Sequence, residues 1–373
     1  MSQALQREFI KEGGISKVHE VVESIGAKNI FLVSGKSSFR LSGAKGKIDR
    51  LLEGKKVVVF NNFPSDFGLH DIEAGISLFK SGSFDLIIAI GGGSVLDMAK
   101  LINILSAQSR SSLFSIIKNS DLIKKKGVPL VALPTTAGSG SQATHFAVVH
   151  VQQEKYSVAH QFILPDLAIV DPALCYSAPR ADAASSALDA LSQSIESYWS
   201  LNATKKSRYY ASKAIKLISK SIVPAVNQKD KASIQSMALA SHLSGKAINI
   251  SKTTLPHALS YLLTSRFGIP HGHSVALFLG FVWRLNYQHG DSALKELMKE
   301  LAVLLSIDVS SFDIFWYNLM FVLGLEVRIS KIGVQQSDLQ IIASSANQER
   351  LKNHPVAIKE ELIIDELNRC SNA

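Results

Sequence analysis

Near residues 171–180 the hydrophobic pattern of this chain changes from one kind of repeat to another. Before it, short apolar runs rich in β-branched residues alternate with segments of helical spacing, as in a parallel sheet that is buried on both faces. After it, apolar residues recur with helical spacing and strand-like runs vanish. Because 373 residues exceed one ordinary core, we predict an α/β domain over 1–175 and an all-helical domain over 176–373.

The alternation in the first domain predicts a doubly wound parallel sheet. The strand candidates are Asn29–Ser34, Lys56–Phe60, Leu86–Ile90, Pro129–Leu133, His145–Val151 and Leu167–Val170, with helices over His70–Lys80 and Val95–Leu105. The second domain predicts helices over Ala183–Trp199, Lys206–Ile222, Lys231–Ile250, Thr254–Arg266, His273–Tyr287 and Asp291–Leu305.

Composition and charge limit the possible binding partners and the cellular location of the chain. The net charge is +9, but the cations are scattered apart from Lys124–Lys126, so we expect no nucleic-acid partner. The longest apolar stretch, Ile314–Leu325, is too short to span a bilayer, and we expect no membrane partner. Cys175 and Cys370 form no disulfide framework and the N-terminus carries no apolar signal segment, which predicts a cytoplasmic protein.

Two polar loops follow predicted strands. Gly91-Gly92-Gly93-Ser94 comes after Ile90 and opens a helix, where close backbone approach and helix N-terminal amides favour a pyrophosphate. The cluster is not the G-x-G-x-x-G fingerprint, because Leu96 stands where the third glycine would be. The second loop runs over 134–141 as PTTAGSGS. Both loops would line the carboxyl edge of the sheet, where open α/β sheets bind ligands.

Three side chains in the helical half form a candidate metal site. Asp189 lies on a predicted helix, His257 begins another, and His271 lies at a turn before a third. One carboxylate and two imidazoles suit Fe(II), Zn or Mn, and three ligands leave an open coordination position. His273 could be a ligand, a proton relay or merely polar.

The order and spacing of five segments resemble the iron-containing (group III) metal-dependent alcohol dehydrogenase family, whose superfamily includes glycerol dehydrogenase and dehydroquinate synthase. These segments are GGGSVLDMAK, LPTTAGSGSQAT, LAIVDPAL, DALSQSIESYW and HALSYLLTSRFGIPHGH. The resemblance implies a Rossmann-like α/β domain followed by an all-α domain, a bound metal and a nicotinamide cofactor. Within the family, the helical segments are most similar to phosphonoacetaldehyde reductases, which make 2-hydroxyethylphosphonate.

The resemblance also implies site residues. For the cofactor they are Gly91, Gly92, Gly93, Ser94, Asp97, Thr135, Thr136, Ser139, Lys155 and Leu174. For the metal they are Asp189, His257 and His271, with Fe(II) the first expectation. The usual fourth ligand, a His one helical turn after the Asp, is Gln193 here, as in phosphonoacetaldehyde-reductase-like members. A second common His is replaced by Tyr261.

The end of the first predicted strand bears on the cofactor type. Many family members carry an Asp there that repels a 2′-phosphate, but this chain has Gly35 followed by Lys36, Ser37, Ser38 and Arg40. Losing the carboxylate and adding cations favours NADP(H) over NAD(H).

Together these features predict an aldehyde reductase in which hydride passes from the nicotinamide to a metal-polarised carbonyl. His273 or Tyr261 would relay the proton. An anionic substrate needs cations, for which Lys246, Lys252 and Arg266 are candidates. We expect a homodimer or larger homo-oligomer, as is frequent in the family.

Three alternatives stay open. The first is a reductase of another small or sugar-acid aldehyde. The second is a lyase like dehydroquinate synthase, which uses NAD without net redox change. The third is a metal-free, non-catalytic nucleotide binder, which Gln193 keeps in play.

Overall fold

A six-stranded parallel sheet forms the centre of the N-terminal unit, with strand order β1-β8-β5-β4-β2-β3. The strands are β1 (Arg7–Ile10), β2 (Asn29–Ser34), β3 (Lys56–Phe60), β4 (Leu86–Gly91), β5 (Leu130–Pro134) and β8 (Leu167–Val170). The computed structural model describes residues 6–109, 112–151 and 154–372. It separates into two units, one ending at Ala178 and the other beginning at Pro179, close to the junction predicted at 175/176.

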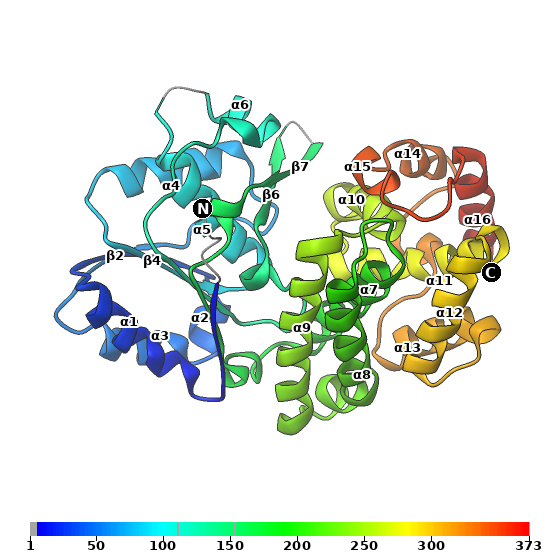
Figure 1. Cartoon of the computed structure of the whole chain (residues 1–373), viewed down its shortest axis with the longest axis horizontal. Coiled ribbons are helices and arrows are strands. Elements are labelled where there is room, and N and C mark those ends of the chain that lie inside the picture. The colour runs from blue at the N-terminus through cyan, green and yellow to red at the C-terminus, as the bar shows by residue number, and fades with distance from the viewer. Residues whose placement is uncertain (1–5, 110–111, 152–153, 373) are drawn as a thin grey trace. The chain divides into compact units, whose positions relative to one another are not determined.

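Helices cover both faces of this sheet (Figure 1). They are α1 (Lys17–Ile25), α2 (Ser38–Leu41), α3 (Ala44–Leu51), α4 (Leu69–Lys80), α5 (Gly93–Ser106) and α6 (Leu113–Lys118). Alternate residues of β2 point to opposite faces, so Ile30 and Leu32 pack in the core with α1 and α3. Phe31 and Val33 pack with α4 and α5 on the other face. Burial on both faces explains why the strands read as unbroken apolar runs.

One predicted strand does not join the sheet. β6 (Phe146–Val151) pairs antiparallel with β7 (Glu154–Ala159) in a separate hairpin. The sequence FAVVHV alternates partly buried and buried residues, the pattern of a strand with one covered face rather than two. The prediction of β6 in the parallel sheet was therefore wrong in its placement, and β1 and β7 were missed.

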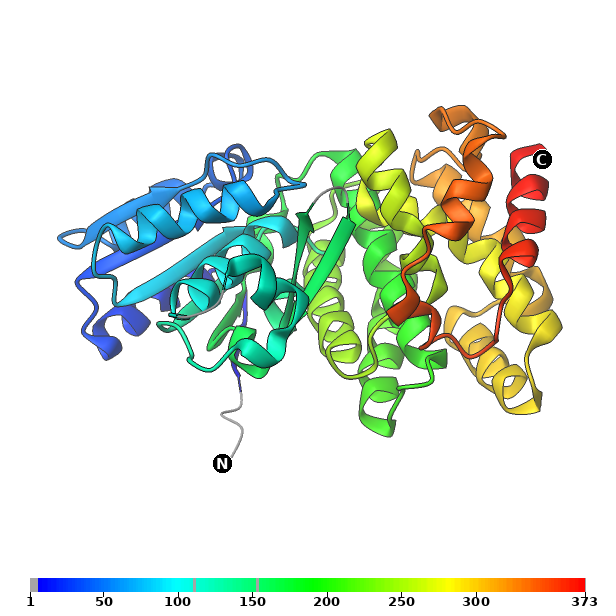
Figure 2. The same ribbon diagram turned by 90° about the horizontal axis from the view of Figure 1, so that it is seen from above.

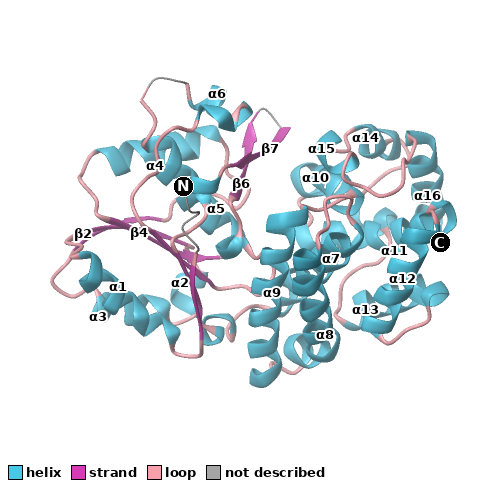
Figure 3. Ribbon diagram, viewed as in Figure 1, coloured by secondary structure: helices cyan, strands magenta, loops and turns pink. Residues whose placement is uncertain are grey.

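The described part of the second unit consists of helices and loops, without a strand (Figures 2 and 3). Its helices are α7 (Arg180–Trp199), α8 (Lys205–Asn227), α9 (Lys231–Ser251), α10 (Leu255–Phe267), α11 (His271–His289), α12 (Ser292–Leu305), α13 (Phe312–Val322), α14 (Asp338–Ser344), α15 (Gln348–Leu351) and α16 (Glu360–Asn372). The α/β-then-all-α fold is thus confirmed. Across the described residues, no helix combines the length and apolar character that crossing a bilayer would take.

Candidate metal centre and cofactor site

Three side chains from three helices of the second unit converge on one point. Asp189 lies in the middle of α7, His257 in the first turn of α10, and His271 is the first residue of α11. One potential ligand atom from each lies within 4.8 Å of the other two, and Asp189 and His257 are buried. The structure therefore brings together the three ligands that the sequence predicts.

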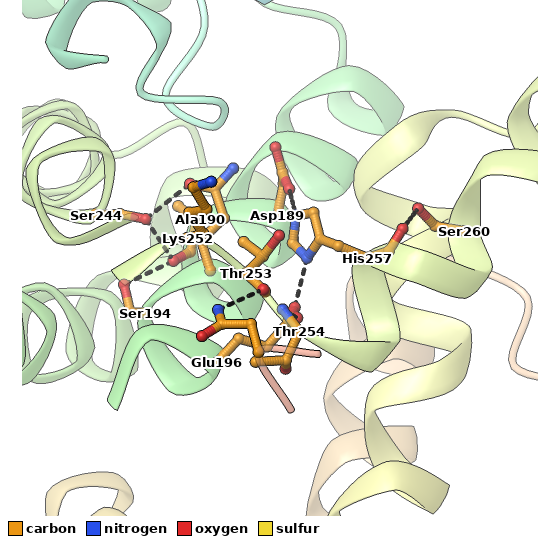
Figure 4. Close-up of polar contacts among 12 residues, drawn as sticks. Asp189, Ala190, Ser194, Glu196, Ser244, Lys252, Thr253, Thr254, His257 and Ser260 are labelled. Carbon is orange, nitrogen blue, oxygen red and sulfur yellow. Dashed lines mark hydrogen bonds and ion pairs between the residues drawn. The ribbon is translucent and has the colours of Figure 1, made fainter. Parts of the chain in front are cut away.

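A second carboxylate fixes the orientation of the His257 ring (Figure 4). Nδ1 of His257 is hydrogen-bonded to Oε1 of Glu196, a residue of α7 that is fully buried. Nε2 of His257 lies 3.3 Å from Oδ1 of Asp189 and makes no hydrogen bond within the described residues. A metal-bound histidine needs this arrangement, with one ring nitrogen donating to a carboxylate and the other carrying the ligand lone pair. Sequence reasoning missed Glu196, although it lies two turns after Asp189 on the same helix.

The carboxylates around His257 favour a positive charge on its ring. Burial lowers the pKa of the His257 imidazole, but the carboxylates of Glu196 and Asp189 outweigh burial and raise it to about 9. Two buried carboxylates around one imidazole are stabilised by a positive charge between them. A divalent ion would meet that demand, and its binding would displace the proton. The site fits a metal with oxygen and nitrogen ligands.

Gln193 lies one helical turn after Asp189 and is buried. Oε1 of Gln193 accepts a hydrogen bond of 2.8 Å from the buried Ser244 hydroxyl on α9. The same hydroxyl lies 3.1 Å from the carbonyl oxygen of Ala190. Ser244 therefore holds the Gln193 amide in a defined place, one helical turn from Asp189.

The two candidate proton relays are His273, whose ring has a defined hydrogen-bond partner, and Tyr261 on α10. The His273 ring has Nε2 2.7 Å from the carbonyl oxygen of Glu326, and its backbone N–H donates to Ser185 Oγ at 3.0 Å. Because a carbonyl only accepts, Nε2 carries the hydrogen and Nδ1 carries the lone pair. Burial lowers the pKa of His273, against the raising effect of Glu326. Tyr261 is partly buried on α10, one turn after His257.

The three candidate cations for a substrate anion each have a partner of their own. Nζ of Lys246 lies 4.9 Å from the centre of the Tyr210 ring, and Lys252 forms an ion pair with Glu349. Arg266 lies 3.1 Å from the Asp338 carboxylate. To hold a substrate, Lys252 and Arg266 would have to leave these carboxylates. The sequence could not show this, because both acids come from distant helices.

In the first unit, the glycine turn leads from β4 into α5. A Cβ on Gly91 would lie 2.5 Å from Cβ of Val95, and one on Gly93 would lie 2.7 Å from Oγ of Ser139. Gly92 is the residue that precedes the helix, and a Cβ there would make only ordinary contact with Thr136, at 3.7 Å. The turn therefore needs glycine, and the loop that carries Ser139 packs directly on the first turn of α5. This leaves the helix N-terminal amides available to a phosphate.

Two buried hydroxyls lie at the carboxyl ends of β2 and β5, the two strands on either side of β4. Ser34 ends β2 and Thr135 follows β5, and neither Oγ nor Oγ1 has a hydrogen-bond partner among the described residues. A buried hydroxyl without a partner is costly, so these atoms fit a polar ligand along this edge. Thr135 was predicted from the sequence; Ser34 was not.

Asp97 and Lys100 of α5 tie the second polar loop to the glycine turn. Oδ1 of Asp97 accepts from Ser141 Oγ at 2.5 Å, and Oδ2 accepts from the Val148 backbone N–H at 3.0 Å. Lys100 has a fully buried side chain, and its ammonium donates to Ser141, to Thr144 and to the carbonyl of Phe146 at 2.8–2.9 Å. Burial lowers the pKa of Lys100 to about 8, although Asp97 favours the charged form.

The remaining predicted cofactor residues are dispersed over the first unit. Gly35 follows β2, and the exposed Lys36 lines a pocket of about 740 Å³ together with Arg40 and Asn61. Lys155 lies in β7 opposite His150. Leu174 is buried in the sheet core. Ser94 is the second residue of α5, and Thr136 lies in the second polar loop.

Comparisons with known proteins agree with this fold. Residues 6–172 match the family model "Iron-containing alcohol dehydrogenase", and residues 183–370 match "Fe-containing alcohol dehydrogenase family, C-terminal". Long-chain-alcohol dehydrogenase 1 of Geobacillus thermodenitrificans is 35% identical over 277 residues, which cover 72% of this chain and 69% of that protein. Probable alcohol dehydrogenase EutG of Escherichia coli is 34% identical over 280 residues, or 74% of this chain and 70% of that protein.

Solved structures extend the similarity to nearly the whole length. Sulfoacetaldehyde reductase from Bifidobacterium kashiwanohense in complex with NAD+ has a TM-score of 0.90 at 25% identity, covering 99% of this chain and 97% of that one. An iron-containing alcohol dehydrogenase from Thermotoga maritima has a TM-score of 0.88 at 25% identity, covering 99% and 98%. Both halves of the chain match the same family, and we conclude that it belongs to the iron-containing alcohol dehydrogenases, oxidoreductases that act on CH–OH groups.

Proposed function

We propose that this chain reduces small anionic aldehydes, with phosphonoacetaldehyde as substrate and 2-hydroxyethylphosphonate as product. The observation that carries the proposal is the convergence of Asp189, His257 and His271 within 4.8 Å, with Glu196 behind His257. When bound, the metal supplies a Lewis acid for the carbonyl oxygen and NAD(P)H supplies the hydride.

The chain's own residues provide binding, orientation and a proton. Asp189, His257 and His271 are the proposed ligands, with Gln193 one helical turn after Asp189 on α7, and three ligands leave room for a substrate oxygen. Nδ1 of His273 is the ring atom that can accept a proton and pass it on, because Nε2–H donates to the Glu326 carbonyl. Tyr261 is the alternative donor, through its phenol.

Charge supports an anionic substrate. From residue 197 to residue 290 the sequence contains twelve Lys and Arg but a single acid, Asp230. Proposed ligands His257 and His271 lie within this segment. A field of one sign attracts substrate of the opposite sign. The similarity to a sulfoacetaldehyde reductase, whose substrate name denotes an anionic aldehyde, points the same way and makes sulfoacetaldehyde the second candidate.

The test is a comparison of substrates on Fe(II)-loaded protein prepared without oxygen. We expect kcat/KM for phosphonoacetaldehyde to exceed that for acetaldehyde and butyraldehyde by about a hundredfold, or roughly 2.7 kcal/mol. Sulfoacetaldehyde in the same assay separates the two candidates. Equal rates with all aldehydes would contradict the proposed anionic substrate but still support a reductase. No reduction of any aldehyde would favour a lyase or a non-catalytic nucleotide binder.

We also propose NADPH as the preferred cofactor. The support is that no carboxylate follows β2 at Gly35 and that Lys36 and Arg40 line one pocket there. We expect the double variant Lys36→Ala/Arg40→Ala to raise KM for NADPH about tenfold and to leave KM for NADH unchanged. Lys47→Ala, on nearby α3, is the matched control. Equal losses with both cofactors would contradict a 2′-phosphate site.

A further inference from the structure

One residue next to the proposed metal centre has a strained backbone. Lys252 follows the last turn of α9 with φ 58° and ψ −177°. This region is essentially confined to glycine, because a Cβ collides with the backbone there. Ser306, another non-glycine residue at positive φ, has ψ 44° and so lies in the ordinary left-handed region, which is less strained. The conformation of Lys252 must therefore be imposed by its surroundings.

The side chain of Lys252 does not impose it. Its ammonium pairs with Glu349, but both side chains are partly exposed, at 38% and 50%. An exposed pair of this kind contributes little to stability. The constraint has to act on the backbone.

Asn353 supplies that constraint from the C-terminal part of the chain. Asn353 is buried, with a relative exposure of 3%, and its Nδ2 donates to the carbonyl of Ser251 at 2.8 Å and to that of Thr253 at 2.9 Å. These carbonyls lie on either side of Lys252. Oδ1 of Asn353 accepts from the backbone N–H of Asn202 at 3.1 Å, so the amide itself is held in place.

The constrained turn leads directly to the metal centre. Thr254 donates to Oε2 of Glu196 from its backbone N–H at 2.7 Å and from Oγ1 at 3.0 Å. Oε1 of Glu196 is the partner of His257 Nδ1. Figure 4 shows Lys252, Thr253 and Thr254 beside Glu196 and His257. A shift of the turn would move Thr254, release one oxygen of Glu196 and free the His257 ring to rotate.

We propose that Asn353 is a positioning residue for the metal centre, holding the turn at Lys252 in the strained conformation that presents Thr254 to Glu196 and so orients His257. This inference rests on the metal centre proposed above. Asn353 itself touches neither metal nor substrate in this account; it acts through the turn.

The first experiment measures Zn(II) affinity of the full chain by chelator competition. We expect Asn353→Ala to raise Kd for Zn(II) by 10- to 100-fold, the usual effect of removing a residue that orients a ligand. Asn347→Ala is the control, because Asn347 also makes a structural hydrogen bond in this part of the chain, at the start of α15. Equal affinities of the two variants would overturn the proposal.

The second experiment isolates the strain. Lys252→Gly and Lys252→Ala both remove the ion pair with Glu349, but only glycine adopts the native angles freely. We expect Lys252→Gly to unfold at a higher temperature than Lys252→Ala. Combined with Asn353→Ala, the glycine variant should bind Zn(II) more tightly than the alanine variant, because the turn no longer needs to be held. If the glycine and alanine variants unfold at the same temperature, and bind Zn(II) equally well when combined with Asn353→Ala, the proposed role of backbone strain is wrong.

A second variant and the behaviour of the wild-type chain distinguish misfolding, an absent metal centre and a wrong role for Asn353. If Asn353→Ala does not fold, Asn353→Asp keeps the shape of the side chain, replaces both donated hydrogens by an acceptor, and should weaken Zn(II) binding in the same way. A wild-type chain that binds no Zn(II) would overturn the metal centre and this inference together. A wild-type chain that binds tightly, beside variants that bind equally well, would overturn this inference alone.

Discussion

At the scale of single residues, the proposed metal centre depends on a carboxylate that is not itself among the proposed ligands. Glu196 is fully buried and receives hydrogen bonds from Thr254 while it pairs with His257. Burying a carboxylate costs free energy of desolvation. Glu196 compensates for this cost by fixing the His257 ring and making the imidazole a better ligand.

The variant Glu196→Gln tests this dependence. The amide keeps the size of the side chain but loses the charge, so we expect Kd for Zn(II) to rise by about 10- to 100-fold. Glu300→Gln serves as control, since Glu300 accepts from Tyr198 and the change likewise removes one carboxylate. A Kd equal to that of the control would show that Glu196 is only a packing residue.

His354 makes a prediction about acid stability. Its side chain is fully buried, neither ring nitrogen has a hydrogen-bond partner among the described residues, and burial lowers the pKa of its imidazole to about 3. The unfolded chain protonates this ring near pH 6.5 while the folded chain does not. Folding stability therefore falls as pH drops from 6.5 toward 3, at about 1.4 kcal/mol per pH unit.

Replacing the ring by an apolar side chain should remove that loss. Between pH 7 and pH 5 we expect the free energy of unfolding of wild type to fall by about 2 kcal/mol more than that of His354→Leu. Denaturant unfolding followed by tryptophan fluorescence measures it, because Trp199, Trp283 and Trp316 all lie in the second unit. Parallel losses in both proteins would show that His354 is protonated in the folded state.

At the scale of elements, α5 organises the proposed cofactor site by holding a loop at two points. Gly93 lets Ser139 pack on its first turn, and Lys100 with Asp97 holds the 141–148 segment two turns further on. An ammonium with three acceptors at 2.8–2.9 Å has every hydrogen satisfied, which makes a fully buried lysine tolerable.

Lys100→Met should loosen that loop without touching the second unit. We expect KM for NADPH to rise about tenfold, or roughly 1.4 kcal/mol, while Kd for Zn(II) stays unchanged. Lys80→Met removes an exposed lysine of the same unit and is the control. A parallel loss of Zn(II) affinity would indicate general unfolding rather than a displaced loop.

At the scale of the whole molecule, the net charge predicts how an anionic substrate would be captured. The net charge is +9, and the excess of cations is concentrated in residues 197–290. Salt screens such a field beyond about 8–10 Å at physiological ionic strength. Steering of an anion should therefore weaken as salt is added, whereas a neutral aldehyde should not respond.

Steady-state rates at low and high salt test this effect. Between about 20 mM and about 500 mM NaCl we expect kcat/KM for phosphonoacetaldehyde to fall several-fold and that for acetaldehyde to stay within twofold. The ratio of the two substrates cancels any general effect of salt on the enzyme. A constant ratio would mean that the basic segment plays no part in substrate capture.

The sequence by itself determined the division into an α/β and an all-helical half, because the period of apolar residues differs between strands and helices and is written locally. It also predicted the glycine turn and gave Asp189, His257 and His271 as candidate ligands, which the structure brings together. The spacing of residues along the chain did not predict the remaining features of the fold. Membership of β6 in a hairpin depends on which of its faces is covered, and helices α13 to α16 were not predicted.

Tertiary structure alone decided what surrounds the site. Glu196, Lys100, Asn353 and Ser34 act through partners far away in the chain or through burial, and neither can be read from spacing. The same holds for Lys252 and Arg266, which the sequence offered as substrate cations but whose charges are met by Glu349 and Asp338. Electrostatic and hydrogen-bond roles belong to pairs of residues, so they emerge only when the fold has brought the pairs together.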